Sequence, residues 1–157
     1  MGTSILEVIV KGAPESILAV LCVYFFCKIK PEKVQLAIMW TILMLITFIS
    51  KITLEGYGMS LLITVAAMVV LFYLVVKIPM ARAINGSLLC VLFLIVSEAT
   101  NFLFIQVFFP DKLELILSDS TTRIIYTIPS TVLLALQVFG VYYFNFLRKN
   151  KKDVQNS

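Results

Sequence analysis

Apolar residues are grouped into five long runs along the chain, and short polar segments separate one run from the next. A helix that crosses the hydrocarbon core of a bilayer needs about 20 mostly apolar residues, and each run approaches or exceeds that length. None shows the segments of about 10 residues with alternating polarity that are typical of a membrane β-barrel. The pattern predicts an all-α polytopic membrane protein, a bundle of five transmembrane helices. The expected helices are 5–27, 34–54, 59–76, 84–109 and 124–147.

Composition agrees with this interpretation. Hydrophobic residues make up 61% of the 157-residue chain and charged residues only 14%, against about 25% charged in soluble domains. We therefore expect residues 1–147 to form one transmembrane domain surrounded by the lipid bilayer, followed by a short basic tail at 148–157. The connection 110–123 is the longest, and its LELIL stretch is expected to form a short interfacial helix.

The basic residues predict the orientation of the bundle. The turns after the first and third runs, together with the tail, hold nine of the 13 lysines and arginines. Because cytoplasmic loops carry an excess of such residues, the N-terminus is expected outside and the C-terminus in the cytoplasm. This arrangement also explains the net charge of +4, so no nucleic-acid partner is expected.

Little in the sequence points to catalysis. The chain has no histidine, which excludes Ser-His and Cys-His nucleophile pairs and histidine-ligated metal sites. Its three cysteines lie in apolar runs without CxxC spacing, and no GxxxxGK[ST] phosphate loop occurs. We expect a non-enzymatic protein without cofactor or metal.

The fourth run carries the most informative polar residue, Glu98, in its middle third. A charged side chain at the centre of a membrane helix costs roughly 2.5–3.5 kcal/mol on insertion scales, and such residues often mark functional sites. Asn101 lies three residues further on and shares its helical face. Since polar groups that face lipid stay unsatisfied, this face is predicted to point into the bundle.

The first and last runs offer polar partners for this face. In the first run, Glu15 shares a side with Lys11, four residues before it, and Pro14 can bend this part of the helix. These charges either reach interfacial water where the chain enters the membrane, or form part of a ligand or partner surface. In the last run, Ser130 and Gln137 share a face, and Pro129 is a candidate kink. The predicted ligand- or partner-binding residues are Glu98, Asn101, Glu15, Arg123 and Gln137.

A structural role for Glu98 is the alternative interpretation. A protonated Glu98 could serve only as a hydrogen-bonding contact between helices. Such bonds contribute about 0.6 kcal/mol on average and about 1.7 kcal/mol in the strongest cases. This gain is smaller than the insertion cost, which slightly favours a role in binding or in a protonation switch.

Several short motifs occur together, in order, over nearly the whole chain. They are Glu15-Ser16, Ile29-Lys30-Pro31, Gly58, Ala83-Ile84 with Glu98, and Arg123-Ile124-Ile125-Tyr126-Thr127-Ile128-Pro129. With these motifs the sequence resembles the membrane-embedded N-terminal sensor region of GHKL-type (Agr-like) histidine kinases of Firmicutes. The resemblance implies a bacterial multi-pass protein of the cell membrane. A kinase of this type continues into a phosphoacceptor segment and an ATP-binding domain, so a chain without them is expected to signal through a partner.

Three functions are consistent with these features. The first is a sensory or regulatory membrane module that binds a small hydrophobic or peptide ligand, a membrane partner protein or a second copy of itself. The second is a small substrate-binding or accessory subunit of a membrane transporter, although the sequence shows no inverted repeat. The third is a structural subunit of a larger membrane complex.

Overall fold

The computed structural model describes residues 8–53, 57–110 and 119–147, except for the side chains of residues 8, 57, 58, 120, 121 and 123. Five helices in this part of the chain are long and apolar enough to cross a membrane, which confirms the predicted all-α, five-helix fold. The expected interfacial helix within 110–123 and residues 55 and 56 of the link at 55–58 lie outside the described residues. The elements are the π-helical turn η1 (Val8–Gly12), α2 (Ala13–Phe26), α3 (Lys33–Thr53), α4 (Tyr57–Leu71) with the π-helical turn η2 (Phe72–Val76), α5 (Met80–Phe108), and α7 (Ser120–Tyr142) with the π-helical turn η4 (Tyr143–Leu147).

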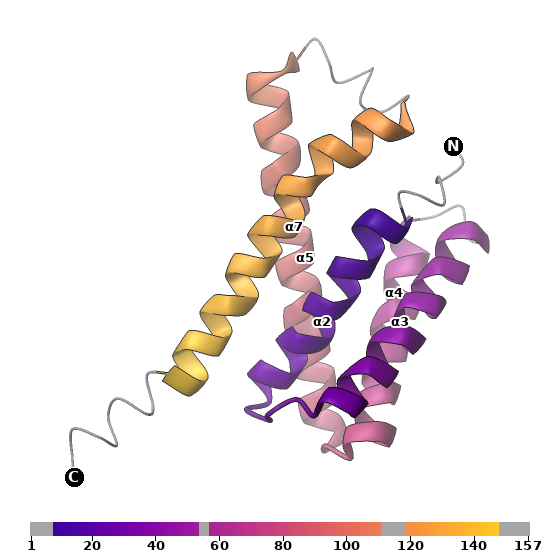
Figure 1. Cartoon of the computed structure of the whole chain (residues 1–157), viewed down its shortest axis with the longest axis vertical. Coiled ribbons are helices and arrows are strands. Elements are labelled where there is room, and N and C mark those ends of the chain that lie inside the picture. Colours follow the sequence, from indigo (N-terminus) through magenta and orange to yellow (C-terminus); the bar gives the residue numbers. More distant parts are fainter. Residues whose placement is uncertain (1–7, 54–56, 111–118, 148–157) are drawn as a thin grey trace.

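Helix α2 occupies the centre of the bundle. It packs against α3, α5 and α7, and in Figure 1 it lies between α7 on one side and the pair α3 and α4 on the other. Of its membrane-crossing stretch, 39% is buried, against 17–22% for the other four. The other four helices therefore present most of the surface to the surroundings.

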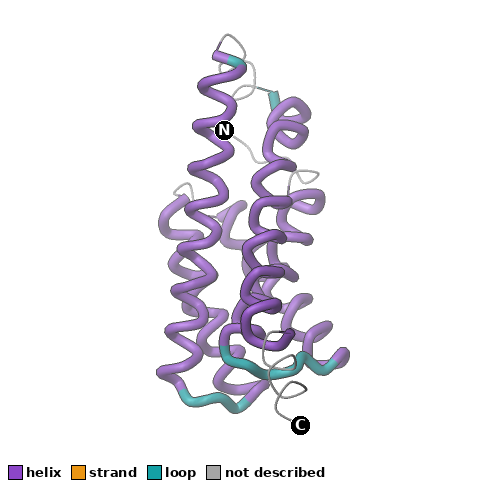
Figure 2. Tube along the Cα trace, turned by 90° about the vertical axis from the view of Figure 1, so that its left-hand side faces the viewer, coloured by secondary structure: helices purple, strands orange, loops and turns teal. Residues whose placement is uncertain are grey.

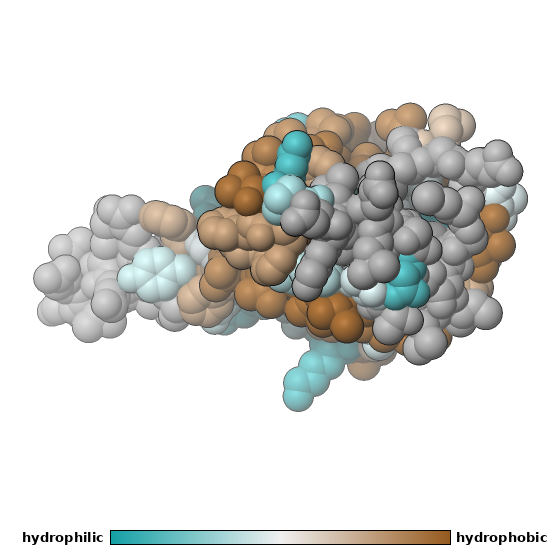
Figure 3. Space-filling model, turned by 90° about the horizontal axis from the view of Figure 1, so that it is seen from above, coloured by the Kyte–Doolittle hydropathy of each residue, from teal (hydrophilic) through white to brown (hydrophobic). Residues whose placement is uncertain are grey.

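This outer surface is strongly apolar. Large side chains such as Val34, Leu62, Leu74 and Val107 are more than half exposed, and apolar residues occupy much of the described surface when the molecule is seen from above (Figure 3). In water a surface of this kind would be a liability, whereas lipid tails solvate it well. A surface of this kind is typical of a multi-pass membrane protein.

Helices α2 and α5 approach each other closely through small residues. The buried side of α5 includes Ala83, Gly86, Ser87 and Cys90. A Cβ atom added to Gly86 would lie 2.8 Å from Cγ1 of Val23 on α2. Small residues at helix contacts let backbones come together in membranes, where association depends on van der Waals packing.

Helix α5 is longer than its neighbours, with 29 residues against 18–23 for the other membrane-crossing stretches. It extends, together with the first part of α7, beyond the ends of α2, α3 and α4 (Figures 1 and 2). The middle of α5 is therefore close to the level at which α2 begins. This offset decides which residues can meet Glu98.

Helix α7 begins at Ser120, four residues before the expected start at 124, and then bends. Asp119 is its N-cap, and the carboxylate accepts a hydrogen bond from the backbone N–H of Thr122 at 2.9 Å. Pro129 lies inside the helix, where its missing N–H leaves the carbonyl of Ile125 without its helical partner. The helix changes direction within its first half, drawn in orange in Figure 1.

We predict that Gly86→Ala destabilises the bundle, because the added methyl group must displace Val23 or separate α2 from α5. Overpacking of this kind costs about 1–3 kcal/mol. The matched control is Gly140→Ala in α7, where an added Cβ meets nothing within 4 Å and helix propensity favours alanine by up to about 1 kcal/mol. The free energy of unfolding would be measured by denaturant titration in detergent micelles. A Gly86→Ala variant as stable as Gly140→Ala would contradict the close packing.

Candidate functional site

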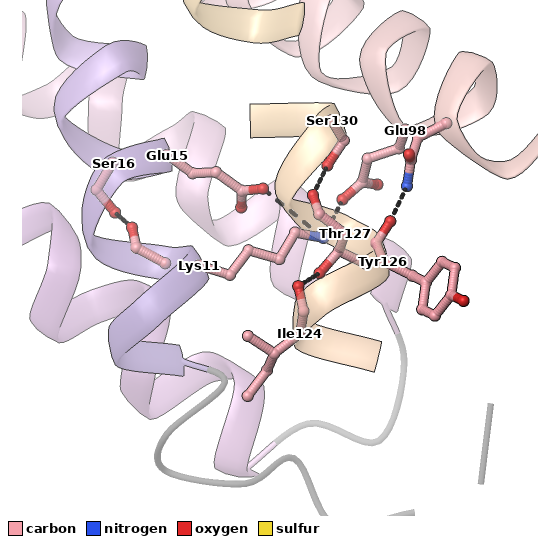
Figure 4. A network of polar contacts seen from close by, with 10 residues as sticks. Lys11, Glu15, Ser16, Glu98, Ile124, Tyr126, Thr127 and Ser130 are labelled. Carbon is pink, nitrogen blue, oxygen red and sulfur yellow. Dashed lines mark hydrogen bonds and ion pairs between the residues drawn. The ribbon is translucent and has the colours of Figure 1, made fainter. Parts of the chain in front are cut away.

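Glu98 faces the beginning of the first transmembrane segment, where it forms an ion pair with Lys11. Lys11 Nζ lies 3.0 Å from Glu98 Oε1 and 3.7 Å from Glu15 Oε1 (Figure 4). The side chains are only 16%, 27% and 13% exposed for Lys11, Glu98 and Glu15 respectively. We call these three residues the charge cluster. Two of them, Glu98 and Glu15, belong to the predicted binding set.

Lys11 reaches Glu98 from the π-helical turn η1, which immediately precedes α2. Pro14 has no backbone N–H, and in a regular α-helix its ring would clash with the carbonyl of Val10. A wider turn at this point accommodates the proline, and π-helical turns are frequent at functional sites. The local sequence therefore explains the unusual backbone that carries the lysine.

Sequence reasoning had not identified Lys11 as the partner of Glu98. It treated Lys11 as a residue that either reaches interfacial water or belongs to a ligand surface, and it looked for partners of Glu98 in Glu15, Arg123, Ser130 and Gln137. One available signal was that Lys11 precedes Glu15 by four residues and so shares its side of the helix. A carboxylate inside a membrane bundle also calls for a nearby cation.

Asn101 points toward the kinked helix α7. Its Nδ2 donates a hydrogen bond to the backbone carbonyl of Tyr126 at 2.9 Å (Figure 4). That carbonyl follows the one of Ile125, which loses its helical partner at Pro129. Asn101 is 5% exposed, and its Oδ1 has no hydrogen-bond partner among the described residues. The amide therefore binds α5 to α7 at the kink.

Gln137 and Ser130 lie on α7 but have different contacts. Gln137 Oε1 accepts a hydrogen bond from Ser97 Oγ of α5 at 3.3 Å, so Ser97 is a second residue that sequence reasoning missed. Ser130 Oγ donates to the carbonyl of Thr127 at 2.7 Å within its own helix. The polar side of α5 thus serves two neighbours, Glu98 toward Lys11 and Ser97 with Asn101 toward α7.

Arg123, the remaining residue of the predicted set, has its backbone in the first turns of α7. Its side chain lies outside the described part of the structure. A role for Arg123 in binding stays a prediction.

Two cavities adjoin the charge cluster. The first, of about 130 Å³, lies between the start of the first segment and α7, and its wall is apolar apart from Lys11 and two threonines. The second, of about 70 Å³, lies between α2, α3 and α4, and Glu15 and Lys51 both line it. No group of three or more potential metal-ligating side chains occurs in the described ranges. The chemistry that these groups support is ionic recognition of a ligand or partner.

Comparison with known proteins adds no relative. No protein-family model matches the chain, and no curated protein or solved structure is significantly similar to it. The resemblance to kinase sensor regions therefore stays a prediction, and any functional proposal rests on the geometry of the bundle.

We predict that Lys11 and Glu98 are energetically coupled. Lys11→Met leaves the largely buried carboxylate of Glu98 without the lysine, and Glu98→Gln leaves the ammonium group of Lys11 with a neutral amide. Breaking a buried ion pair costs up to about 3–5 kcal/mol. Because both side chains keep some exposure, we expect single losses of about 1–3 kcal/mol. The double variant should lose clearly less than the sum of the two. Unfolding free energies of the four proteins, measured in the same micelles, give the coupling energy.

The matched control cycle combines Lys11→Met with Arg82→Gln. Arg82 is an exposed residue near the opposite end of α5, so its coupling to Lys11 should be within about 0.5 kcal/mol of zero. Equal coupling in the two cycles would show that the Lys11–Glu98 contact carries no specific energy.

Proposed function

We propose that this chain is a non-enzymatic sensory or regulatory membrane module, and that the charge cluster is the centre at which a ligand or a membrane partner acts on the bundle. The partner is another membrane protein or a second copy of the chain. A small hydrophobic or peptide ligand is the corresponding ligand class. The observation that carries this proposal is the Lys11–Glu98 ion pair, which connects the first segment to α5 at 3.0 Å.

The ion pair lies close to a second contact of α5, through which a change at the pair can affect α7. Three residues after Glu98, Asn101 holds the carbonyl of Tyr126 at the bend of α7. A molecule that competes for Glu98 or displaces Lys11 would change how the first segment sits against α5. The same change would alter the support of the kinked helix, so that two packings of the bundle would bind the ligand unequally.

Energetics also favours a role beyond stability. Removing two charges from water costs several kcal/mol per ion, and well-packed apolar residues often stabilise a fold as much as a buried ion pair does. An apolar pair at positions 11 and 98 would thus suffice for packing alone. A retained ion pair is well suited to a switch because each charge can exchange its partner for a ligand.

For the membrane orientation we propose an outer N-terminus and a cytoplasmic C-terminus in a bacterial cell membrane. The described ends of α2, α3, η2 and α5 agree with the alternation that this requires, and the basic turns would lie against anionic cytoplasmic lipid. The charge cluster then lies toward the outer face. Fusions to a reporter that is active only in the cytoplasm should be active at Ser157 and inactive when inserted in the 111–118 segment; the reverse pattern would overturn the orientation.

Recovery of a partner from native membranes tests the function. The tagged chain would be cross-linked in cells, purified and analysed by quantitative mass spectrometry. We expect one membrane protein, or a second copy of the chain, to be recovered in near-stoichiometric amount and to fall several-fold with Glu98→Gln, which keeps the shape and removes the charge.

The matched control is Thr100→Val. Thr100 is an exposed residue two positions from Glu98, and its hydroxyl donates to the carbonyl of Val96 in the same helix; partner recovery should be unchanged. A folded Glu98→Gln variant with unaltered partners would overturn the assigned centre. Substrate accumulation in proteoliposomes that contain this chain alone would overturn the regulatory proposal in favour of transport.

A further inference from the structure

The cavity of about 70 Å³ between α2, α3 and α4 has charges of opposite sign in its wall. Glu15 lines it from α2 and Lys51 lines it from the last turn of α3. Four hydroxyl groups also line it, those of Ser16, Thr47, Ser60 and Thr64. Burying such charged and hydroxyl groups inside a membrane bundle costs free energy unless they bind a polar molecule.

Each of these hydroxyl groups already donates its proton to a hydrogen bond within the bundle. Ser16 donates to the carbonyl of Gly12 at 2.6 Å, and Thr47 and Thr64 donate to the carbonyls four residues before them at 2.8 and 2.9 Å. Ser50 donates to the carbonyl of Thr47 at 3.1 Å, so in the Ser50–Ser60 contact of 2.9 Å Ser60 is the donor. Since a hydroxyl has one proton and two lone pairs, what these groups still offer an occupant is acceptors.

The two charged side chains add further acceptors and one donor to the cavity wall. Glu15 has Lys11 only at 3.7 Å, longer than a hydrogen bond, so its carboxylate keeps acceptor capacity. Lys51 makes no ion pair within 4 Å in the described part of the chain. The cavity therefore presents acceptors around Glu15 and one strong donor, the ammonium group of Lys51.

We propose that this cavity binds a zwitterionic group, a primary ammonium joined by a short linker to a carboxylate or phosphate. The ammonium donates to Glu15 and to the neighbouring hydroxyl oxygens, and the anionic group pairs with Lys51. At 10–15 Å³ per water-sized group, 70 Å³ has room for about five to seven such groups, which matches the smallest amino acids. A bare metal cation fits less well because Lys51 would repel it.

This inference adds a zwitterionic ligand to the small hydrophobic or peptide ligands of the proposed sensory function, and in that sense it rests on that function. Two sources supply the same chemistry, a free amino acid and the headgroup of phosphatidylethanolamine. The cavity lies near the ends of its helices, with Lys51 two residues before the end of α3 and Ser60 in the first turn of α4. Both a dissolved molecule and a lipid headgroup reach this level of a membrane.

The full-length chain in nanodiscs of phosphatidylglycerol, a lipid without an amine, provides the test. One arm measures equilibrium binding of radiolabelled glycine, and a second measures retention of added phosphatidylethanolamine by native mass spectrometry. Betaine and phosphatidylcholine are matched controls, since their trimethylated nitrogens donate no hydrogen bond. Saturable binding of glycine, of phosphatidylethanolamine or of both is expected, with at least tenfold weaker binding of the trimethylated compounds.

Variants then place the bound molecule in the cavity. Lys51→Met should weaken binding about tenfold or more, as expected for loss of a charged hydrogen-bonding partner, and Thr64→Val should weaken it several-fold. Lys33→Met, at the exposed opposite end of α3, should leave it unchanged. The fluorescence of Trp40, the only tryptophan, whose Nε1 donates to the carbonyl of Ala13 at 3.0 Å, reports that each variant is folded.

Failure of both zwitterions to bind, equal binding of the trimethylated compounds, or full affinity in folded Lys51→Met would each overturn the proposal. Stabilisation by sodium ions alone would also overturn it. The assay uses no partner protein and leaves Glu98 intact. Its outcome is thus separate from the partner-recovery experiment on the proposed function.

Discussion

The ion pair between Lys11 and Glu98 is the constraint on which the packing around the start of α2 depends. Neither charge can face hydrocarbon without a large cost, so the first segment and α5 must meet at this point, and they do so at 3.0 Å. The wide turn η1 before Pro14 and the extra length of α5 both make the meeting possible. The remaining polar contacts of α5 are arranged around it.

Two kinds of contact hold α5 in its place. Near the start of α5, close packing of Gly86 against Val23 fixes its distance from α2. Further along the helix, directed contacts replace packing, with Glu98 bound to Lys11 and Asn101 bound to the carbonyl of Tyr126. Steric packing tolerates little movement, whereas ionic and hydrogen-bonded partners can be exchanged. The second half of α5 is therefore where a ligand could change the structure.

The sequence predicted the five helices because length and hydropathy decide membrane crossing almost independently of neighbours. It did not identify the partner of Glu98, because Glu98 lies in the middle of its own run whereas Lys11 lies near the start of the first run. The relative heights of neighbouring helices depend on how their whole surfaces pack, as α2 packs on Gly86 of α5. A local sequence pattern does not encode these heights.

The order of charges across the bundle links the two proposals. Lys51 of α3, Glu15 of α2, Lys11 of η1 and Glu98 of α5 alternate in sign from one element to the next. Contacts of 3.7 and 3.0 Å join the last three residues, while Glu15 and Lys51 both line the cavity of about 70 Å³. A zwitterion in that cavity would complete the series. The carboxylate of Glu15 would then be shared between the ligand and Lys11, so that ligand binding would change the strength of the Lys11–Glu98 ion pair. A sensor requires a coupling of this kind.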